Sequence, residues 1–473
     1  MKRKILSVLL AISLLAAMIS GCGSSSDESG STGTPVSEST DNSGETTVET
    51  PEADEDTSGE TAAEKMTSEG GTLTIWDTFV DGSLGAAQEE IIAAFQEAHP
   101  EITVERVPKE LSVLEETLKA AFMAGDAPDV IYLEAGIGTV GNYVQAGYYQ
   151  DLTQVYEDYG WKDNIMSACW EIPSADNFIW GVGNEMETMS LYVNQDIFDE
   201  LDLPAPQTVE ELTADMQIIK DAGYNVLANT LDSAWHTNMN FVGTILYAFM
   251  TQEEISDCMN NDGSWDKESV RAAVNCIQDW LDKGYFPSHP EVDGDQEQMF
   301  FSGEYACWVT GNWEVGNITE KTDFTTSIYP FPGSETCADG GSQVNFAGGA
   351  YLVYSGSEVK DAAYDLIDFS LNNPDTAKIW AETGGTMPPY AQEYDVNLSP
   401  LGERVVELLG DESLQNTAGI NMWLGANSFD FFSEAGQKLV IGSLDEDSFI
   451  EEAEKARELD IETGLTKGSF KAN

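Results

Sequence analysis

From residue 71 onward, apolar positions recur with two periods, and these periods alternate along the chain. Alternation at every second residue is typical of strands, whereas apolar residues three and four apart are typical of helices. In chain order, the first segments are a strand at 71–76, a helix at 88–98, a strand at 102–107, a helix at 111–124 and a strand at 129–133. This order predicts an α/β fold with mixed, mostly parallel sheets flanked by helices.

The second half of the chain is richer in helix. Further amphipathic helices are predicted at 209–222, 241–250, 267–283 and 361–371. Thr208 precedes the first of them, and Glu211 follows three residues later, which is a capping-box arrangement. About 400 residues exceed what one hydrophobic core usually holds, so two lobes are expected. No repeat of short, fixed period argues for a solenoid or propeller.

The residues before this region have a different character. Lys2, Arg3 and Lys4 precede an apolar run at 5–19, which is shorter than the roughly 20 residues that a membrane span needs. Residues 1–21 are therefore predicted to be a secretion signal. The Ile-Ser-Gly-Cys ending at Cys22 resembles the bacterial lipobox, which implies cleavage before Cys22, lipidation of that cysteine, and attachment to the extracellular face of the cytoplasmic membrane. Residues 22–69, mostly Ser, Thr, Gly and acidic residues, are predicted to be a disordered tether.

Net charge and cysteines narrow the possible partners. A formal charge of −63 disfavours nucleic acid and indicates a solvated, self-repelling surface. Beyond Cys22 the cysteines are odd in number, and only Cys258 with Cys276 is a pair worth testing for a disulfide. Neither the cysteines nor His99, His236 and His289 have metal-ligand spacing, so no metal site and no cofactor are predicted.

Several motifs occur in an order typical of one family. They are Ala121–Val130 (Ala-Phe-Met-Ala-Gly-Asp-Ala-Pro-Asp-Val), Gly147–Leu152, Leu191–Asn194, Leu203–Leu212, Phe301–Ala306 with Gly311–Trp313, and Phe346–Ala350. Together they resemble the maltose-binding-protein-like solute-binding proteins of bacterial sugar importers. Val209 stands where that family usually has Trp, and Gly183-Asn184-Glu185 departs from its usual crossover.

The resemblance implies a two-lobed, type II periplasmic-binding-protein-like fold with a multi-strand hinge. Residues 70–183 and 346–387 would form the N-terminal lobe, and residues 184–345 and 388–473 the C-terminal lobe. It also implies a monomer without catalytic residues that closes over a carbohydrate and delivers it to the permease subunits of an ABC transporter. Contact with the membrane would be through the lipid anchor only.

A sugar site needs aromatic platforms and polar hydrogen-bonding groups. Trp76, Asp77 and Glu134 are candidates because they lie at predicted strand ends, where open sheets bind ligands. The full candidate set, drawn from such positions and from the family resemblance, is Trp76, Asp77, Glu134, Asn184, Glu185, Trp235, Asn312, Trp313, Gly349, Thr386, Trp423 and Asp430. No Arg or Lys lies in these segments, which favours a neutral saccharide, in particular an oligosaccharide, over an anionic ligand.

Other interpretations stay open at this point. Aromatic walls with carboxylates also suit a polyamine or another cationic solute, and paired carboxylates would serve an extracellular glycan-active enzyme. Residues 136–141 match a dinucleotide-binding Gly pattern, but we expect these glycines to shape a strand-to-helix loop. Trp161, Trp265, Trp280 and Trp380 lie in or beside amphipathic segments and are predicted to be core residues.

Overall fold

The computed structural model describes residues 71–472 except 176, 232–235, 261–262, 292–294, 387–395, 412 and 468, and it does not describe the side chains of residues 236–238 and 416. Ala63–Asn473 forms one compact unit. The predicted signal, Cys22, the tether and Trp235 lie outside the described residues, so the predictions about them stay predictions.

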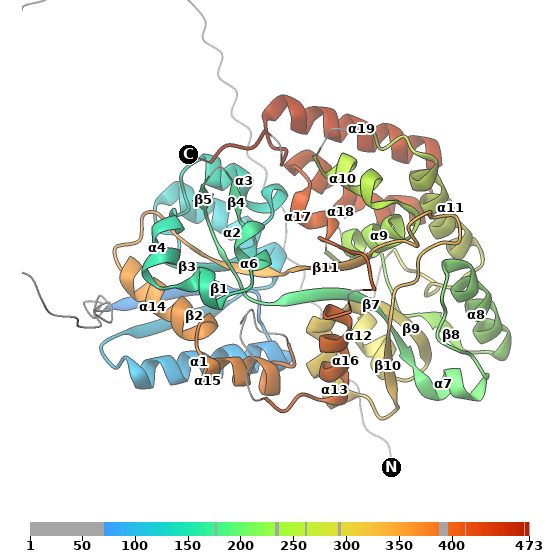
Figure 1. Ribbon diagram of the computed structural model, residues 1–473, viewed down its shortest axis with the longest axis horizontal. Helices are drawn as coiled ribbons and strands as arrows, with labels where there is room; N and C mark the ends of the chain where they lie inside the picture. Colours follow the sequence, from blue (N-terminus) through green and yellow to red (C-terminus); the bar gives the residue numbers. More distant parts are fainter. Residues whose placement is uncertain are drawn as a thin grey trace, which may run out of the picture. The chain divides into compact units, whose positions relative to one another are not determined.

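The first sheet holds the predicted N-terminal strands. Its order is β2-β1-β3-β12-β6 (Figure 1), with β1 at Thr72–Asp77, β2 at Thr103–Pro108, β3 at Val130–Glu134, β6 at Val182–Gly183 and β12 at Gly349–Val353. The strands predicted at 71–76, 102–107 and 129–133 are confirmed, each beginning one residue later than expected. β1 is parallel to β2 and β3, whereas β12 is antiparallel to β3 and β6.

The second sheet is organised around one long strand, β7. Its order is β13-β11-β7-β9-β8, and β10 also pairs with β7; the strands are β7 at Met186–Asn194, β8 at Asn225–Leu227, β9 at Tyr305–Gly311, β10 at Thr326–Pro330, β11 at Gln343–Ala347 and β13 at Asn416–Thr417. β9, β10 and β11 all run antiparallel to β7. Both sheets are therefore mixed as expected, but parallel pairing predominates only around β1. A separate pair joins β4 (Ser174–Ala175) and β5 (Phe178–Ile179).

Helices connect the strands and pack on the sheets (Figure 1). On and near the first sheet they are α1 (Gly82–Ala98), α2 (Leu111–Ala124), α3 (Ile137–Gln145), α4 (Thr153–Asp158), α5 (Trp161–Asn164), α6 (Ala168–Glu171), α14 (Lys360–Leu371), α15 (Pro374–Lys378) and the π-helical turn η2 (Ile379–Gly384). The others are α7 (Gln195–Glu200), α8 (Val209–Ala222), α9 (His236–Phe249), α10 (Gln252–Asn260), α11 (Glu268–Asp282), α12 (Gln296–Phe301), η1 (Asn312–Glu314), α13 (Val315–Lys321), α16 (Pro400–Leu409), α17 (Ile420–Trp423), α18 (Ala426–Val440) and α19 (Glu446–Thr463).

The predicted helices form, with informative differences at their starts. α2 and α8 match the predicted bounds, whereas α1 begins at Gly82, because small residues in its first turns hide the helical pattern. Thr208 caps α8 by accepting a hydrogen bond from the Glu211 backbone N–H at 3.1 Å. The return bond of a capping box is displaced by one residue: Glu211 Oε2 accepts from the Gln207 N–H at 2.7 Å.

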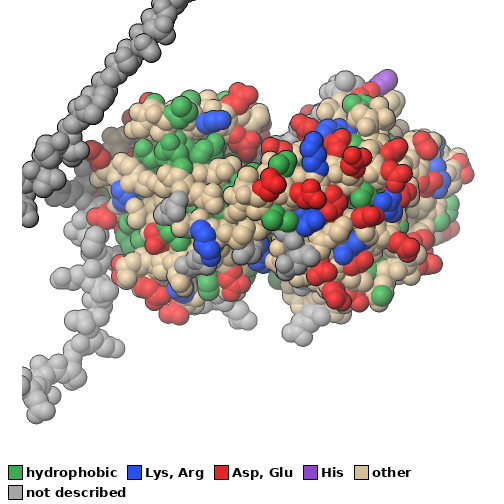
Figure 2. Space-filling view, turned by 90° about the horizontal axis from the view of Figure 1, so that it is seen from above, with side chains coloured by type: hydrophobic (Ala, Val, Ile, Leu, Met, Phe, Trp, Pro, Cys, Tyr) green, Lys and Arg blue, Asp and Glu red, His purple; other side chains and the backbone are tan. Residues whose placement is uncertain are grey.

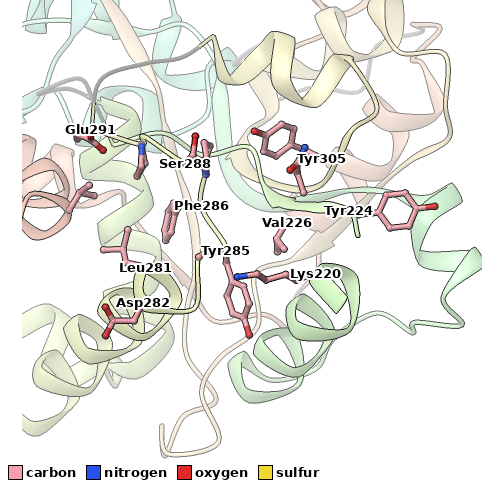
Figure 3. A pocket seen from close by; sticks show the side chains of 15 residues that line it. Lys220, Tyr224, Val226, Leu281, Asp282, Tyr285, Phe286, Ser288, Glu291 and Tyr305 are labelled. Carbon is pink, nitrogen blue, oxygen red and sulfur yellow. The ribbon is translucent and has the colours of Figure 1, made fainter. Parts of the chain in front are cut away.

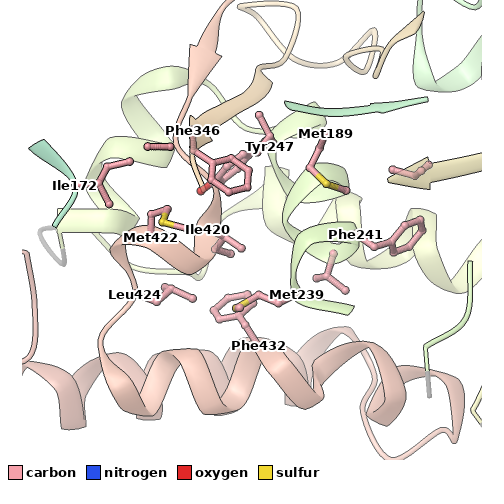
Figure 4. Packing of buried hydrophobic residues seen from close by; sticks show 14 of the residues in the cluster. Ile172, Met189, Met239, Phe241, Tyr247, Phe346, Ile420, Met422, Leu424 and Phe432 are labelled. Carbon is pink, nitrogen blue, oxygen red and sulfur yellow. The ribbon is translucent and has the colours of Figure 1, made fainter. Parts of the chain in front are cut away.

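The core confirms the four predicted structural tryptophans. Trp161, Trp265, Trp280 and Trp380 are all fully buried. Figure 4 shows part of the largest cluster, where Phe346, Ile420 and Phe432 from distant parts of the chain pack together. The described cysteines are all free thiols, so Cys258 and Cys276 are not joined.

The glycines at 136–141 have a different role from the one expected. Gly136 precedes α3, but Gly138 and Gly141 lie inside the helix. A Cβ atom on Gly138 would lie 2.8 Å from the Phe429 side chain, so this glycine allows α3 to approach α18 closely. The expectation that all three shape a loop is wrong, because Gly138 and Gly141 lie within α3 and Gly138 allows close helix packing.

No helix in the described part of the chain is long and apolar enough to cross a membrane. On the face shown in Figure 2, acidic side chains are scattered and interspersed with fewer Lys and Arg side chains. This distribution agrees with the solvated surface predicted from the net charge.

The Gly-Asp-Ala-Pro-Asp segment has a structural explanation. Asp129 Oδ2 accepts hydrogen bonds from the Thr74 N–H at 2.8 Å and the Thr74 hydroxyl at 2.7 Å. Its Oδ1 accepts from the Ser357 hydroxyl at 2.7 Å. One carboxylate therefore joins β1, the start of β3 and the segment after β12.

We expect Asp129→Ala to lower the free energy of unfolding by about 2–3 kcal/mol, because it removes charge-assisted hydrogen bonds at a partly buried site. Urea unfolding would measure the difference. Asp126→Ala, at an exposed position three residues away, is the matched control and should change stability by less than about 0.5 kcal/mol. Equal effects of the two substitutions would contradict this role of Asp129.

Candidate functional site

A cavity of about 370 Å³ lies between the two sheets, at the end where β1 and β3 finish. Residues from the first-sheet side line it: Thr78, Phe79, Leu84, Glu110, Leu111, Tyr132, Glu134 and Gly349. From the second-sheet side come Glu185, Glu187, Asn240, Gln296, Glu297, Trp308, Thr310, Trp313 and Glu314. The carboxyl ends of parallel strands are where open α/β sheets bind ligands.

Two chain crossings between the sheets form one wall of this cavity. The chain passes from β6 to β7 at 184–185 and returns from β11 to β12 at Gly348. The crossings are hydrogen-bonded to each other, from the Asn184 N–H to the Gly349 carbonyl at 2.9 Å and from the Gly348 N–H to the Glu185 carbonyl at 3.0 Å. The two crossings therefore form a paired connection between the lobes.

Glycines are required in the return crossing. A Cβ atom on Gly348 would lie 1.8 Å from Glu187 Oε1, and one on Gly349 would lie 2.5 Å from the Tyr132 ring. Such distances are far below van der Waals contact. The absence of side chains at 348 and 349 therefore lets Glu187 and Tyr132 reach the cavity.

Six glutamates line the cavity: Glu110, Glu134, Glu185, Glu187, Glu297 and Glu314. None of the described lining residues is a lysine or an arginine. Glu134 Oε2 accepts a hydrogen bond from Asn421 Nδ2 at 2.6 Å, and Glu314 Oε2 accepts from Asn317 Nδ2 at 3.3 Å. The described lining of the cavity is thus rich in acceptors and includes no basic side chain.

The buried carboxyl groups bind protons more tightly than usual. Glu185 is 1% exposed, Glu187 8% and Glu314 7%. Burial raises the pKa of Glu185 to about 8, and it raises the pKa of Glu187 well above its ordinary value, with further increases from Glu185 and Glu134. Burial also raises the pKa of Glu314 to about 8. At neutral pH these groups therefore favour the uncharged acid.

Aromatic rings supply the apolar part of the lining. Phe79 and Tyr132 contact each other with ring centroids 4.3 Å apart. Trp308 is almost completely buried, and its Nε1 donates to Gln296 Oε1 at 3.3 Å. Trp313 is half-buried, and its ring covers Gly311, where a Cβ atom would lie only 1.9 Å away. Trp313 thus combines a fixed position with an accessible face.

The cavity brings together four of the predicted site residues: Glu134, Glu185, Trp313 and Gly349. Asn184 and Thr386 are buried but do not line it, and Asp430 is exposed on α18. Trp76 and Trp423 also lie outside the lining, where each ring is covered by a lysine, Lys109 at 4.3 Å and Lys467 at 3.3 Å from the centroid.

Two of the predicted polar contacts have structural partners instead. Both Asp77 oxygens accept hydrogen bonds from Arg106, at 2.7 and 2.9 Å. Asn312 accepts from the Thr188 N–H at 2.7 Å and donates to the Met186 carbonyl at 3.1 Å. Position at a strand end was the signal for Asp77, but a strand-end carboxylate can equally pair with a base on the neighbouring strand.

Sequence reasoning missed Phe79, Tyr132, Glu187 and Glu314. Glu187 could have been found, because it lies two residues after Glu185 and alternate residues of a strand share one face. Glu314 directly follows Trp313. Tyr132 lies in the interior of β3, and only the glycine at 349 on the neighbouring strand opens its ring to the cavity.

A second cavity, of about 600 Å³, lies within the second lobe (Figure 3). Tyr224, Tyr285 and Tyr305 line it together with Lys220, whose Nζ donates to the Lys283 carbonyl. It lies at the amino ends of β8 and β9, where Asn225 pairs with Tyr305. That is the opposite end from the one where such sheets bind ligands. The cavity between the sheets is therefore the candidate site.

Comparisons with known proteins agree with this architecture. A family model described as bacterial extracellular solute-binding protein matches residues 90–400. A galactooligosaccharide-binding protein of Bacillus subtilis (strain 168) is 24% identical over 330 residues, covering 68% of this chain and 74% of that protein. A chitin oligosaccharide binding protein has a similar structure, with a TM-score of 0.74 and 18% identity over 83% of this chain and 99% of that one. A structure from work on xylan utilization by Caldanaerobius polysaccharolyticus also has a TM-score of 0.74, with 20% identity over 81% of this chain and 99% of that one.

The buried acid at Glu185 predicts a stability that depends on pH. Its pKa in the folded protein, about 8, lies above the ordinary value of 4.5. The folded state therefore binds this proton more tightly than the unfolded state, and its contribution to stability falls as pH rises from about 4.5 to 8. Glu185→Gln should remove this dependence, and each tenfold difference in proton affinity corresponds to about 1.4 kcal/mol.

Urea unfolding at pH 5, 6, 7 and 8 would test this expectation. The variant should gain stability relative to the wild type as pH rises, by a few kcal/mol over the whole range. Glu110→Gln, at an exposed position of the same cavity, should keep the wild-type profile. Parallel profiles of the wild type and Glu185→Gln would show that this carboxyl is ionised in the folded protein.

Proposed function

Because the chain belongs to the bacterial extracellular solute-binding protein family, we propose that it captures a carbohydrate between its lobes and delivers it to the permease of an ABC importer. The observation that carries the proposal is the composition of the cavity between the sheets. Aromatic faces and uncharged or acidic hydrogen-bonding groups converge there from both lobes. This combination suits the apolar faces and hydroxyl edges of sugar rings.

The size and charge of the cavity support the same class of ligand. A volume of about 370 Å³ lies within the usual range for small-molecule sites. Phosphorylated, sulfated or carboxylated sugars would lack the basic partner they usually need, since the described lining residues include no lysine or arginine. The similarity to proteins described as binding galactooligosaccharide and chitin oligosaccharide favours an oligosaccharide.

Capture would involve closure of the lobes about the paired crossings. The hydrogen bonds of Asn184 and Gly348 hold the crossings together, so small changes in their backbone angles would rotate one lobe against the other. The predicted lobe boundaries at 183/184 and 345/346 are close in sequence to these crossings, and the predicted boundary at 387/388 lies outside the described residues. The protein would act as a monomer and leave its ligand chemically unchanged.

We expect Trp313→Ala to weaken saccharide binding at least tenfold, because it removes the accessible ring of the cavity. Calorimetry of the domain from residue 70 against a panel of mono- and oligosaccharides would give the affinities. The control is Trp423→Ala, which removes a half-buried tryptophan outside the cavity and should leave affinity unchanged. Binding that survives Trp313→Ala but not Trp423→Ala would place the site elsewhere, and an absence of saccharide binding would refute the proposal.

The proposal includes a lipid anchor at Cys22. Metabolic labelling with a radioactive fatty acid should modify the full-length protein, and Cys22→Ser should abolish the label because the acceptor thiol is gone. Cys258→Ser, which removes a buried thiol of the folded part, should retain it. Equal labelling of both variants would contradict anchoring at Cys22.

A further inference from the structure

The proposed function accounts for the aromatic rings of the cavity and for hydrogen-bond acceptors, but it does not require so many of these acceptors to be buried carboxyl groups. Sugar hydroxyls need hydrogen-bond acceptors, and amides or backbone carbonyls supply them without charge. Buried carboxyls without a base are costly, because they must either lose their charge or remain unpaired in a medium of low dielectric. Their presence in this number points to a feature of the ligand that requires them.

Two of the six carboxyls, Glu185 in the crossing and Glu187 at the start of β7, have only neutral or acidic ionisable neighbours among the described residues. The ionisable groups that interact with Glu185 and Glu187 are Tyr132, Cys169 and Glu134, and each is neutral or negative. Nearby bases have other partners: Arg106 pairs with Asp77. Lys321 interacts with Glu297 and Glu314 on the second lobe. A positive charge is therefore missing at the crossing rather than throughout the cavity.

An independent observation concerns Glu185 itself. Its side chain is 1% exposed and lines the cavity, yet its Oε2 has no hydrogen-bond partner among the described residues. Buried polar atoms in folded proteins are nearly always paired, so an exception in a cavity wall marks a position for a ligand donor. The neighbouring Glu187 is held in place by the Gly349 N–H.

We propose that the solute is an amine-bearing saccharide, whose ammonium group binds Glu185 and Glu187 at the crossing while a sugar ring contacts Trp313. This inference rests on the proposed function and replaces the neutral saccharide favoured by the sequence with a cationic one. An ammonium group offers three donors and a charge, so it would satisfy the unpaired oxygen and balance the charge of one of the two carboxyls in its ionised form. The proton held by the buried acid would pass to the solvent when the ammonium group binds.

The aromatic lining favours a sugar over a simple polyamine. Phe79, Tyr132 and Trp313 present ring surface that a flexible alkyl chain would cover only in part. Spermidine carries the amine without the ring, and an N-acetylated sugar carries the ring without the charge. Spermidine therefore tests the contribution of the ammonium group, and the N-acetylated sugar tests the contribution of the ring.

Calorimetry at pH 7 would compare glucosamine and galactosamine oligomers with their N-acetylated forms of the same length and linkage, with spermidine as a third probe. We expect one free-amine oligomer to bind at least tenfold more tightly than its acetylated form. Its observed heat should vary with the ionisation enthalpy of the buffer, because protons are released. Glu185→Gln should abolish the preference and the proton release, whereas Glu116→Gln, at an exposed position of α2 outside the cavity, should retain both. Thermal unfolding would establish that both variants are folded.

Equal affinity for the free and acetylated oligomers, or an unchanged preference in Glu185→Gln, would overturn the amine proposal while leaving carbohydrate capture intact. Binding of spermidine with no response to any saccharide would overturn both proposals in favour of a polyamine receptor. A lack of binding to every saccharide pair and to spermidine would likewise refute both carbohydrate capture and amine recognition.

Discussion

The pairing of the two crossings between the sheets is the constraint on which the rest of the structure depends. The backbone groups of Asn184, Glu185, Gly348 and Gly349 are joined by two hydrogen bonds, so the passage out of the first sheet and the passage back into it lie side by side. This pairing continues the register of β11 against β7 and of β12 against β6. Both lobes and the cavity between them are positioned relative to that short segment.

The same constraint explains why charged groups are buried at the centre of the molecule. Close approach of the crossings needs glycine at 348 and 349, and the space left by the missing side chains is occupied by Glu187 and Tyr132. Glu185, in the crossing directly before β7, also has little contact with water. Removal of these carboxyls from water raises the pKa of Glu185 and Glu187, and no base among the described cavity-lining residues offsets this effect. The close approach of the two crossings thus accounts both for the backbone geometry and for the burial of these carboxyls.

The sequence predicted the fold better than the site. Sequence pattern located β1, β2, β3, α2 and α8 almost to the residue. Apolar residues alternate in β1, α2 and α8 bury one face, and β3 is a short buried run that follows a Gly-Asp-Ala-Pro turn. It did not reveal that β7 would pair antiparallel with β9, β10 and β11, since strand direction depends on contacts between distant segments. A polar residue at a strand end was a good candidate for the ligand site only where no basic side chain of the protein paired with it. Glu134 reaches the cavity, whereas Asp77 is held by Arg106, whose position on β2 could not be inferred from spacing.

Composition alone could not separate two very different sets of carboxylates. The net charge is −63, and most of the acidic residues in the described part of the chain are exposed or partly exposed, where water and salt screen their mutual repulsion. The few at the crossing are removed from water, where a missing counter-charge has a much larger effect on free energy. Closure of the lobes would exclude more water from these groups, so the closed state is favoured only by a solute that offers them donors or charge. In such a site, solute recognition and lobe closure are coupled. The carboxyls that would bind the solute would also disfavour the closed state when the solute is absent.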